Sequence, residues 1–95
     1  MPRRNPNDRP APPAWAVYLL RCRDGSLYAG VTNDLSRRLA RHEAGTASKY
    51  TRARLPVRLV YTEPQADRGA ALRREAALKA LPKAAKEALA AGAGG

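Results

Sequence analysis

Two short apolar runs near the start of the chain are rich in β-branched and aromatic side chains. They cover residues 15–22 (WAVYLLRC) and 27–32 (LYAGVT), and an Asp-Gly dipeptide typical of hairpin turns lies between them. A similar run at residues 57–61 (VRLVY) ends shortly before Pro64. The pattern therefore predicts a β-hairpin, followed later by a third strand that Pro64 closes.

The length of the hairpin loop decides which side chains share a face of the sheet. A two-residue loop would put Tyr18 and Tyr28 on opposite faces, because side chains alternate along a strand. A three-residue loop over residues 23–25 puts both phenols on one face and sets Tyr18 across from Gly30. We expect the three-residue loop, with Gly25 left-handed and with Gly30 leaving space for a pocket.

A helix is predicted directly after the hairpin. Asn33 or Asp34 caps it, and Gly45 ends it just after residue 44. Residues 46–54 are polar and basic and show no periodicity, so they predict a loop that lies over a ligand. The third strand then follows this loop.

The second predicted helix starts at the Asp67 cap and covers residues 68–81, and Pro82 then opens an alanine-rich helix to about residue 90. Glu75 falls inside the apolar arc of the second helix, which consists of Ala71, Leu72, Ala76 and Leu78. A carboxylate in this position must be paired or bind a metal to offset its desolvation.

These elements predict a compact domain of the α/β class, of the α+β type. We expect a three-stranded mixed or antiparallel sheet flanked by about three helices, with a site on the sheet face near the first two. Residues 15–90 form this domain. Residues 1–14, which are rich in proline and arginine, predict a disordered basic arm, and residues 91–95 a flexible tail.

The formal net charge of +10 favours a polyanionic partner, for which nucleic acid is the commonest choice. A bias of genome composition is the alternative, since Ala, Arg and Pro are all abundant. Cys22 is the single cysteine, which fits a reducing cytoplasm. No stretch reaches the length of a signal peptide or a membrane span. We expect a cytoplasmic protein without membrane contact, as a monomer or weak dimer.

Several side chains in these elements suit the cleavage of phosphodiesters. Arg38 and His42 lie four residues apart and therefore on one side of the first helix. Arginine pairs with phosphate oxygens, and histidine and tyrosine can both take part in proton transfer. Each of these residues also has a purely structural interpretation, and Glu75 can simply pair with Arg38 or Lys79.

Short motifs in the same elements resemble those of the GIY-YIG nuclease domain, and in particular its small stand-alone bacterial group. Tyr18 aligns with the tyrosine of the Gly-Ile-Tyr motif, and residues 28–30 (YAG) stand for Tyr-Ile-Gly. Residues 33–39 (NDLSRRL) resemble the helix start that carries the family arginine. Residues 72–75 (LRRE) resemble the helix with the metal-binding glutamate, and residues 49–51 (KYT) resemble this subgroup.

The resemblance implies a metal-dependent endonuclease that hydrolyses DNA phosphodiester bonds in DNA repair or processing. It assigns catalysis to four residues: Tyr18, Tyr28, Arg38 and His42. It assigns Mg²⁺ or Mn²⁺ to Glu75 and leaves open which tyrosine is the general base. Side chains expected to bind nucleic acid are Arg37, Arg41, Lys49, Tyr50, Arg52 and Arg54. The alternatives are a non-catalytic nucleic-acid-binding module and an interaction scaffold with the same fold.

Overall fold

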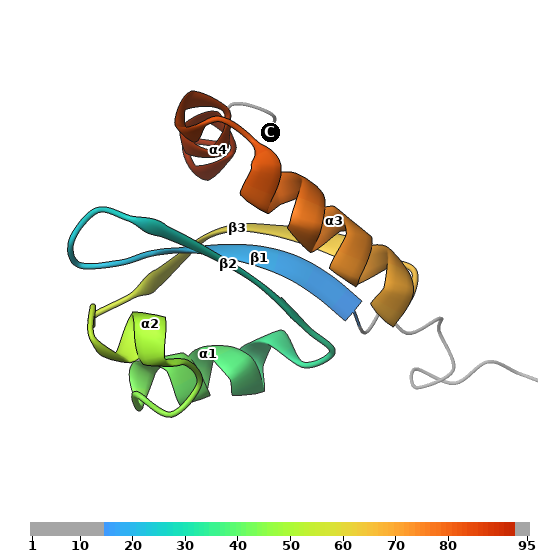
Figure 1. Ribbon diagram of the computed structural model, residues 1–95. Coiled ribbons are helices and arrows are strands. Elements are labelled where there is room, and N and C mark those ends of the chain that lie inside the picture. The colour runs from blue at the N-terminus through green and yellow to red at the C-terminus, as the bar shows by residue number, and fades with distance from the viewer. Residues whose placement is uncertain (1–14, 93–95) are drawn as a thin grey trace, which may run out of the picture.

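The computed structural model describes residues 15–92, in which a three-stranded antiparallel sheet lies between two layers of helices (Figure 1). The strands are β1 (Trp15–Arg21), β2 (Leu27–Thr32) and β3 (Arg58–Gln65), in the spatial order β2-β1-β3. The central strand β1 is apolar along most of its length, as expected for a strand covered on both faces. The expected basic arm and most of the expected tail lie outside the described residues.

The helices cover opposite faces of the sheet (Figure 1). They are α1 (Leu35–Glu43), α2 (Lys49–Arg52), α3 (Arg68–Ala80) and α4 (Lys83–Ala90). Tyr18 and Leu20 of β1 pack in the layer of α1, whereas Val17 packs against α3. Alternation along β1 sends adjacent side chains to different layers.

The hairpin loop has the three-residue form, so the register expected from the sequence is confirmed. Gly25 has a φ of +87°, and the backbone N–H of Cys22 donates to the carbonyl oxygen of Ser26 over 2.9 Å. This pairing places Tyr18 opposite Gly30 and keeps Tyr18 and Tyr28 on the same face. The left-handed conformation at the turn is one that glycine adopts without strain.

The predicted aspartate caps are also confirmed, which explains where the two longest helices begin. The Asp34 carboxylate accepts from the backbone N–H of Arg37, and that of Asp67 accepts from Ala70. Pro82 immediately precedes α4 rather than lying in its first turn. No helix within residues 15–92 is long and apolar enough to cross a membrane.

Two boundaries differ from the prediction. Residues 46–54 contain the short helix α2 rather than only a loop, because the Ser48 hydroxyl accepts from the backbone N–H of Thr51 and caps it. Strand β3 continues through Pro64 instead of ending before it. This is possible because β3 is an edge strand. It pairs with a neighbouring strand on one side only, so a proline without an N–H is tolerated there.

Candidate active site

The phenol ring of Tyr18 lies directly against the backbone of Gly30. A Cβ atom at Gly30 would stand 2.4 Å from the Tyr18 hydroxyl oxygen and 2.5 Å from its Cζ atom, far inside contact distance. The absent side chain of Gly30 therefore makes room for the Tyr18 ring. The expectation that this space is an empty pocket is wrong.

A buried chain of hydrogen bonds runs inward from Tyr18. The Tyr18 hydroxyl lies 2.9 Å from His42 Nε2, and His42 Nδ1 lies 2.8 Å from the hydroxyl of Thr51. Arg38 Nε donates to the Tyr18 oxygen over 3.4 Å. The three residues that these hydrogen bonds link in series, Tyr18, His42 and Thr51, are 0% exposed.

The surrounding donors fix the direction of this chain. Arg38 can only donate, so the Tyr18 oxygen accepts from it and gives its own hydrogen to His42 Nε2. His42 Nδ1 then carries the imidazole hydrogen and donates to Thr51, whose hydroxyl lies 2.9 Å from that of Ser48. In the opposite tautomer the Tyr18 hydrogen would have no acceptor among residues 15–92.

Burial keeps both partners of the first hydrogen bond neutral. It raises the pKa of the Tyr18 phenol, and the nearby Arg38 cation opposes this rise. Electrostatic interactions with Tyr28 and Glu75 raise the same pKa further. Burial also lowers the pKa of His42 below its ordinary value of 6.5, and the Arg38 cation adds to this shift. Tyr18 therefore keeps its proton at neutral pH.

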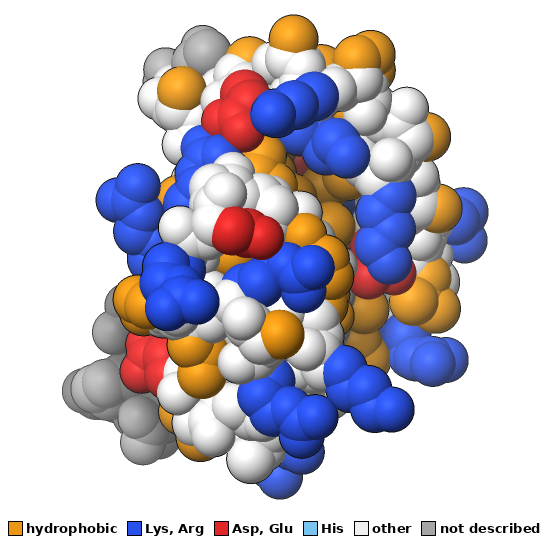
Figure 2. All heavy atoms as spheres, turned by 60° about the vertical axis from the view of Figure 1, so that its left-hand side comes forward, with side chains coloured by type: hydrophobic (Ala, Val, Ile, Leu, Met, Phe, Trp, Pro, Cys, Tyr) orange, Lys and Arg blue, Asp and Glu red, His pale blue; other side chains and the backbone are white. Residues whose placement is uncertain are grey.

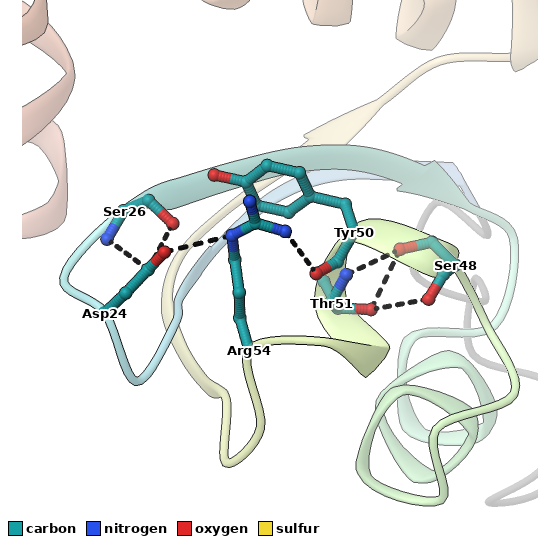
Figure 3. Close-up of polar contacts among 6 residues, drawn as sticks. All are labelled: Asp24, Ser26, Ser48, Tyr50, Thr51 and Arg54. Carbon is teal, nitrogen blue, oxygen red and sulfur yellow. Dashed lines mark hydrogen bonds and ion pairs between the residues drawn. The ribbon is translucent and has the colours of Figure 1, made fainter.

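Tyr28 stands at the start of an aromatic stack that leads to the surface. Its ring lies in a T-shaped arrangement with the His42 ring, with 5.4 Å between the ring centroids. It stacks on the Tyr50 ring, with 5.8 Å between the centroids. The guanidinium carbon of Arg54 lies 3.7 Å from the centre of the Tyr50 ring, and Asp24 accepts from Arg54 Nε over 2.9 Å (Figure 3). The hairpin turn therefore holds Arg54 in place, and Arg54 in turn covers Tyr50.

The other basic residues predicted to bind nucleic acid surround this site. Arg37 and Arg41 line an open pocket of ≈ 130 Å³ together with Arg38. Lys49 and Arg52 are exposed on α2, in the same layer. These side chains give the α1 and α2 layer a basic surface that extends from the Tyr18 network to solvent.

Glu75 approaches the site from the opposite layer of helices. Its side chain is 20% exposed, and Lys79 Nζ lies 3.5 Å from one carboxylate oxygen. Glu75 is the weakest of the groups that raise the pKa of Tyr18. Helix α3 contacts both β1 and β2, and its Lys79 lines a hollow at the β2 edge of the sheet.

A hollow at this edge joins the two layers. It has a volume of ≈ 180 Å³, and its lining includes Tyr28, Tyr50, Lys79 and Lys86. Figure 2 shows a groove with an apolar floor and basic side chains along both sides. Side chains from both layers of helices therefore line this cleft.

Glu75 fits a divalent cation only as a single protein ligand. Within residues 15–92 no three His, Cys, Asp or Glu side chains gather in a group that would hold a metal. Mg²⁺ commonly binds one or two carboxylates and completes its shell with water and phosphate. The long contact with Lys79 leaves carboxylate oxygens of Glu75 available for such an ion.

The sequence did not identify Ser48 and Thr51 as part of this network. Thr51 was noted only within a tripeptide that resembles the family, and Ser48 carried no assigned role. The spacing from Ser48 to Thr51 is that of a helix cap and the third residue after it, which is a usable signal for a short helix. The burial of Thr51 against His42, however, results from the tertiary fold.

Comparisons with known proteins show the family of this chain. A family model described as the GIY-YIG catalytic domain matches residues 14–88, and the chain belongs to this family. A UPF0213 protein of Xanthomonas axonopodis pv. citri is 54% identical over 72 residues, which are 76% of this chain and 71% of that protein. A UPF0213 protein of Vibrio cholerae is 49% identical over 82 residues, which are 85% of this chain and 81% of that protein.

The fold also matches a solved structure. The solution NMR structure of a UPF0213 protein from Bacillus halodurans superposes with a TM-score of 0.54 at 43% identity, over 85% of this chain and 86% of that one. The predicted α+β class and the GIY-YIG-like fold are confirmed. Membership of this family indicates nuclease activity, with nucleic acid as the implied substrate.

Gly30→Ala tests how closely Tyr18 depends on the missing side chain. The new methyl group would overlap the phenol, so we expect the variant to lose about 1–3 kcal/mol of stability in urea unfolding. We also expect its Tyr18–His42 hydrogen bond to break, visible as a shift of the His42 ring resonances in NMR spectra.

Gly69→Ala is a matched control on α3, where the nearest atoms are the ends of flexible side chains at 3.3 and 3.4 Å. We expect this change to leave the free energy of unfolding unchanged or to raise it by about 0.5–1 kcal/mol. Equal stability of Gly30→Ala and the natural protein would show that Tyr18 does not occupy this space.

The lowered pKa of His42 predicts how stability depends on pH. The unfolded chain takes up a proton near pH 6.5, whereas folded His42 resists protonation until the pH is lower. Below pH 6.5 the unfolded state therefore binds more protons, and stability that is complete above this pH is lost as the pH falls.

Urea unfolding between about pH 8 and pH 5 should show this decrease, and His42→Gln should remove it. The assignment is direct because His42 is the single histidine of the chain. Stability that stays constant down to about pH 5 in the natural protein would contradict a buried, neutral His42.

Proposed function

We propose that the protein is a metal-dependent endonuclease that hydrolyses DNA phosphodiester bonds, with a role in DNA repair or processing. The observation that supports this best is the position of the Arg38 guanidinium. Its Nε donates to the buried Tyr18 phenol over 3.4 Å, and Arg38 lines an open pocket together with Arg37 and Arg41. Basic side chains also line the hollow at the β2 edge, as a polyanionic substrate requires.

Arg38 is suited to hold the phosphate that is cut. Its Nε–H donates to the Tyr18 oxygen, which fixes the plane of the guanidinium. Its two terminal amino groups make no hydrogen bond with residues 15–92, so both remain available for phosphate oxygens. Arg37 and Arg41 line the same pocket and would bind neighbouring phosphates.

Glu75 would hold the Mg²⁺ or Mn²⁺ ion. The bound ion supplies positive charge that polarises the phosphate and lowers the pKa of a coordinated water. In the unliganded protein Lys79 provides the compensating charge at 3.5 Å. Glu75 must release Lys79, at least in part, when the cation binds.

We assign Tyr28 as the general base that acts on the attacking water. A general base must reach the proton that it abstracts, and Tyr18 is 0% exposed with its hydroxyl engaged by Arg38 and His42. Tyr28 is partly exposed and lines the cleft at the sheet edge. In this assignment Tyr18 and His42 are positioning residues that hold Arg38 beside the reacting phosphate.

Glu75→Gln tests the metal assignment. The amide keeps the shape of the side chain but removes its charge, so cleavage of DNA with Mg²⁺ or Mn²⁺ should fall about 10²-fold or more. DNA affinity, measured over a range of salt concentrations without metal, should not weaken. The exposed Glu43→Gln is the matched control and should retain full activity.

Undiminished cleavage by Glu75→Gln, in protein freed of contaminating nucleases, would overturn the metal assignment. DNA binding without cleavage in the natural protein would favour a non-catalytic binding module, in which Lys79 simply neutralises Glu75. A protein that neither binds nor cuts DNA at low salt would favour an interaction scaffold.

The two tyrosines should differ when each loses its hydroxyl. Tyr28→Phe should slow cleavage at saturating DNA and metal without changing stability, because its hydroxyl makes no hydrogen bond with the described residues. Tyr18→Phe should also lower the free energy of unfolding by about 1–3 kcal/mol, since His42 and Arg38 lose their partner. Single-turnover cleavage and urea unfolding measure the two effects. Full activity of Tyr28→Phe beside an inactive but stable Tyr18→Phe would make Tyr18 the base.

A further inference from the structure

A second polar cluster lies on the far edge of the sheet, away from the candidate active site. Arg74 Nε donates to Glu63 Oε1 over 2.7 Å, and Arg74 Nη2 donates to Glu63 Oε2 over 3.2 Å. The Tyr61 hydroxyl and the Gln65 side chain also donate to the Glu63 carboxylate. A bidentate ion pair therefore connects strand β3 to helix α3. The Tyr61 and Gln65 side chains hold the Glu63 carboxylate in position.

Apolar packing alone defines the rotation of α3 weakly. Only Ala71 and Leu78 of this helix are buried among the described residues, and Leu72 is 37% exposed. Ala76, which the sequence placed on the apolar arc with Leu72, is exposed as well. A helix with so many alanines presents similar small surfaces in several directions, so packing discriminates little between nearby rotations.

The rotation of α3 decides where Glu75 points. Arg74 and Glu75 are adjacent, so their side chains leave the helix about 100° apart, and fixing one direction fixes the other. Side-chain ends lie about 5–6 Å from a helix axis, so a rotation of about 20° moves a carboxylate by about 2 Å. A catalytic group must be held within about 0.5 Å of its working position.

We propose that the Glu63–Arg74 ion pair is a positioning device that sets the rotation of α3 and thereby fixes the direction of the Glu75 carboxylate, which lies 3.5 Å from the Lys79 amine at the cleft of the β2 edge. This inference rests on the proposed function, in which Glu75 holds the divalent ion. Neither Glu63 nor Arg74 touches the substrate or the ion in this proposal. They act from the β3 edge, through the helix that carries Glu75.

The chain contains a matched control for this ion pair. Arg21 of β1 binds Glu87 of α4 through two hydrogen bonds of 2.7 and 2.6 Å. This pair also ties a strand to a helix of the same layer, with the same chemistry and a similar partial exposure. It holds α4, however, rather than the helix with Glu75.

The experiment compares Glu63→Gln and Arg74→Lys with Glu87→Gln. The affinity for Mn²⁺ is measured by calorimetry without DNA, and the Mg²⁺ concentration for half-maximal cleavage is measured separately. For Glu63→Gln we expect Mn²⁺ affinity to fall about tenfold, with a matching rise in the Mg²⁺ requirement and a smaller change at saturating metal. Arg74→Lys keeps the positive charge but loses the planar guanidinium that makes two hydrogen bonds, so its loss of Mn²⁺ affinity should be smaller.

Glu87→Gln should lose a similar amount of thermal stability but keep its Mn²⁺ affinity within about twofold. NMR contacts between the Ala71 and Val17 methyl groups, which share one cluster, report the rotation of α3 directly. We expect these contacts to weaken in Glu63→Gln and to persist in Glu87→Gln.

Two results would overturn the proposal while leaving the proposed function intact. One is unchanged Mn²⁺ affinity in Glu63→Gln; the other is an equal loss in Glu63→Gln and Glu87→Gln, which would reflect general destabilisation. If the natural protein binds Mn²⁺ no better than Glu75→Gln, the metal assignment fails and the proposal fails with it.

Discussion

The placement of the Tyr18 phenol is the constraint on which the rest of the structure depends. Its ring occupies the space that Gly30 leaves on β2, and its hydroxyl binds His42 of α1, which in turn binds Thr51 of α2. One side chain of β1 therefore links three other elements. In a buried, low-dielectric interior such a network is stabilising only if every polar atom is satisfied. Among residues 15–92 no buried side-chain nitrogen or oxygen lacks a partner.

The narrow sheet makes it possible for the two helix layers to contribute to one site. With β2 at the edge and β1 in the centre, side chains of both layers, Tyr50 of α2 and Lys79 of α3, line one hollow at the β2 edge. An unpaired edge strand also invites pairing with other chains, and charged side chains around it oppose this. Lys79 and Lys86 at the β2 edge fulfil that role and also attract a polyanion.

The features that the sequence predicted correctly follow from local rules. Loop length and strand alternation fix the shared face of Tyr18 and Tyr28, and an aspartate side chain that reaches a backbone N–H three residues on fixes each helix start. None of these inferences requires knowledge of a distant contact.

The features that were missed depend on distant contacts or on very short elements. Helix α2 has four residues, too few for periodicity to reveal, and Ser48 and tertiary contacts stabilise it. Helical periodicity shows which side of α3 is apolar, but it does not show which face of the sheet α3 covers. The weak apolar stripe of α3 explains a further error, since Leu72 was expected inside and is exposed. Where packing leaves the rotation of a helix undefined, a polar contact such as Glu63–Arg74 must define it, and such a contact between separate elements leaves no periodic signal in the sequence.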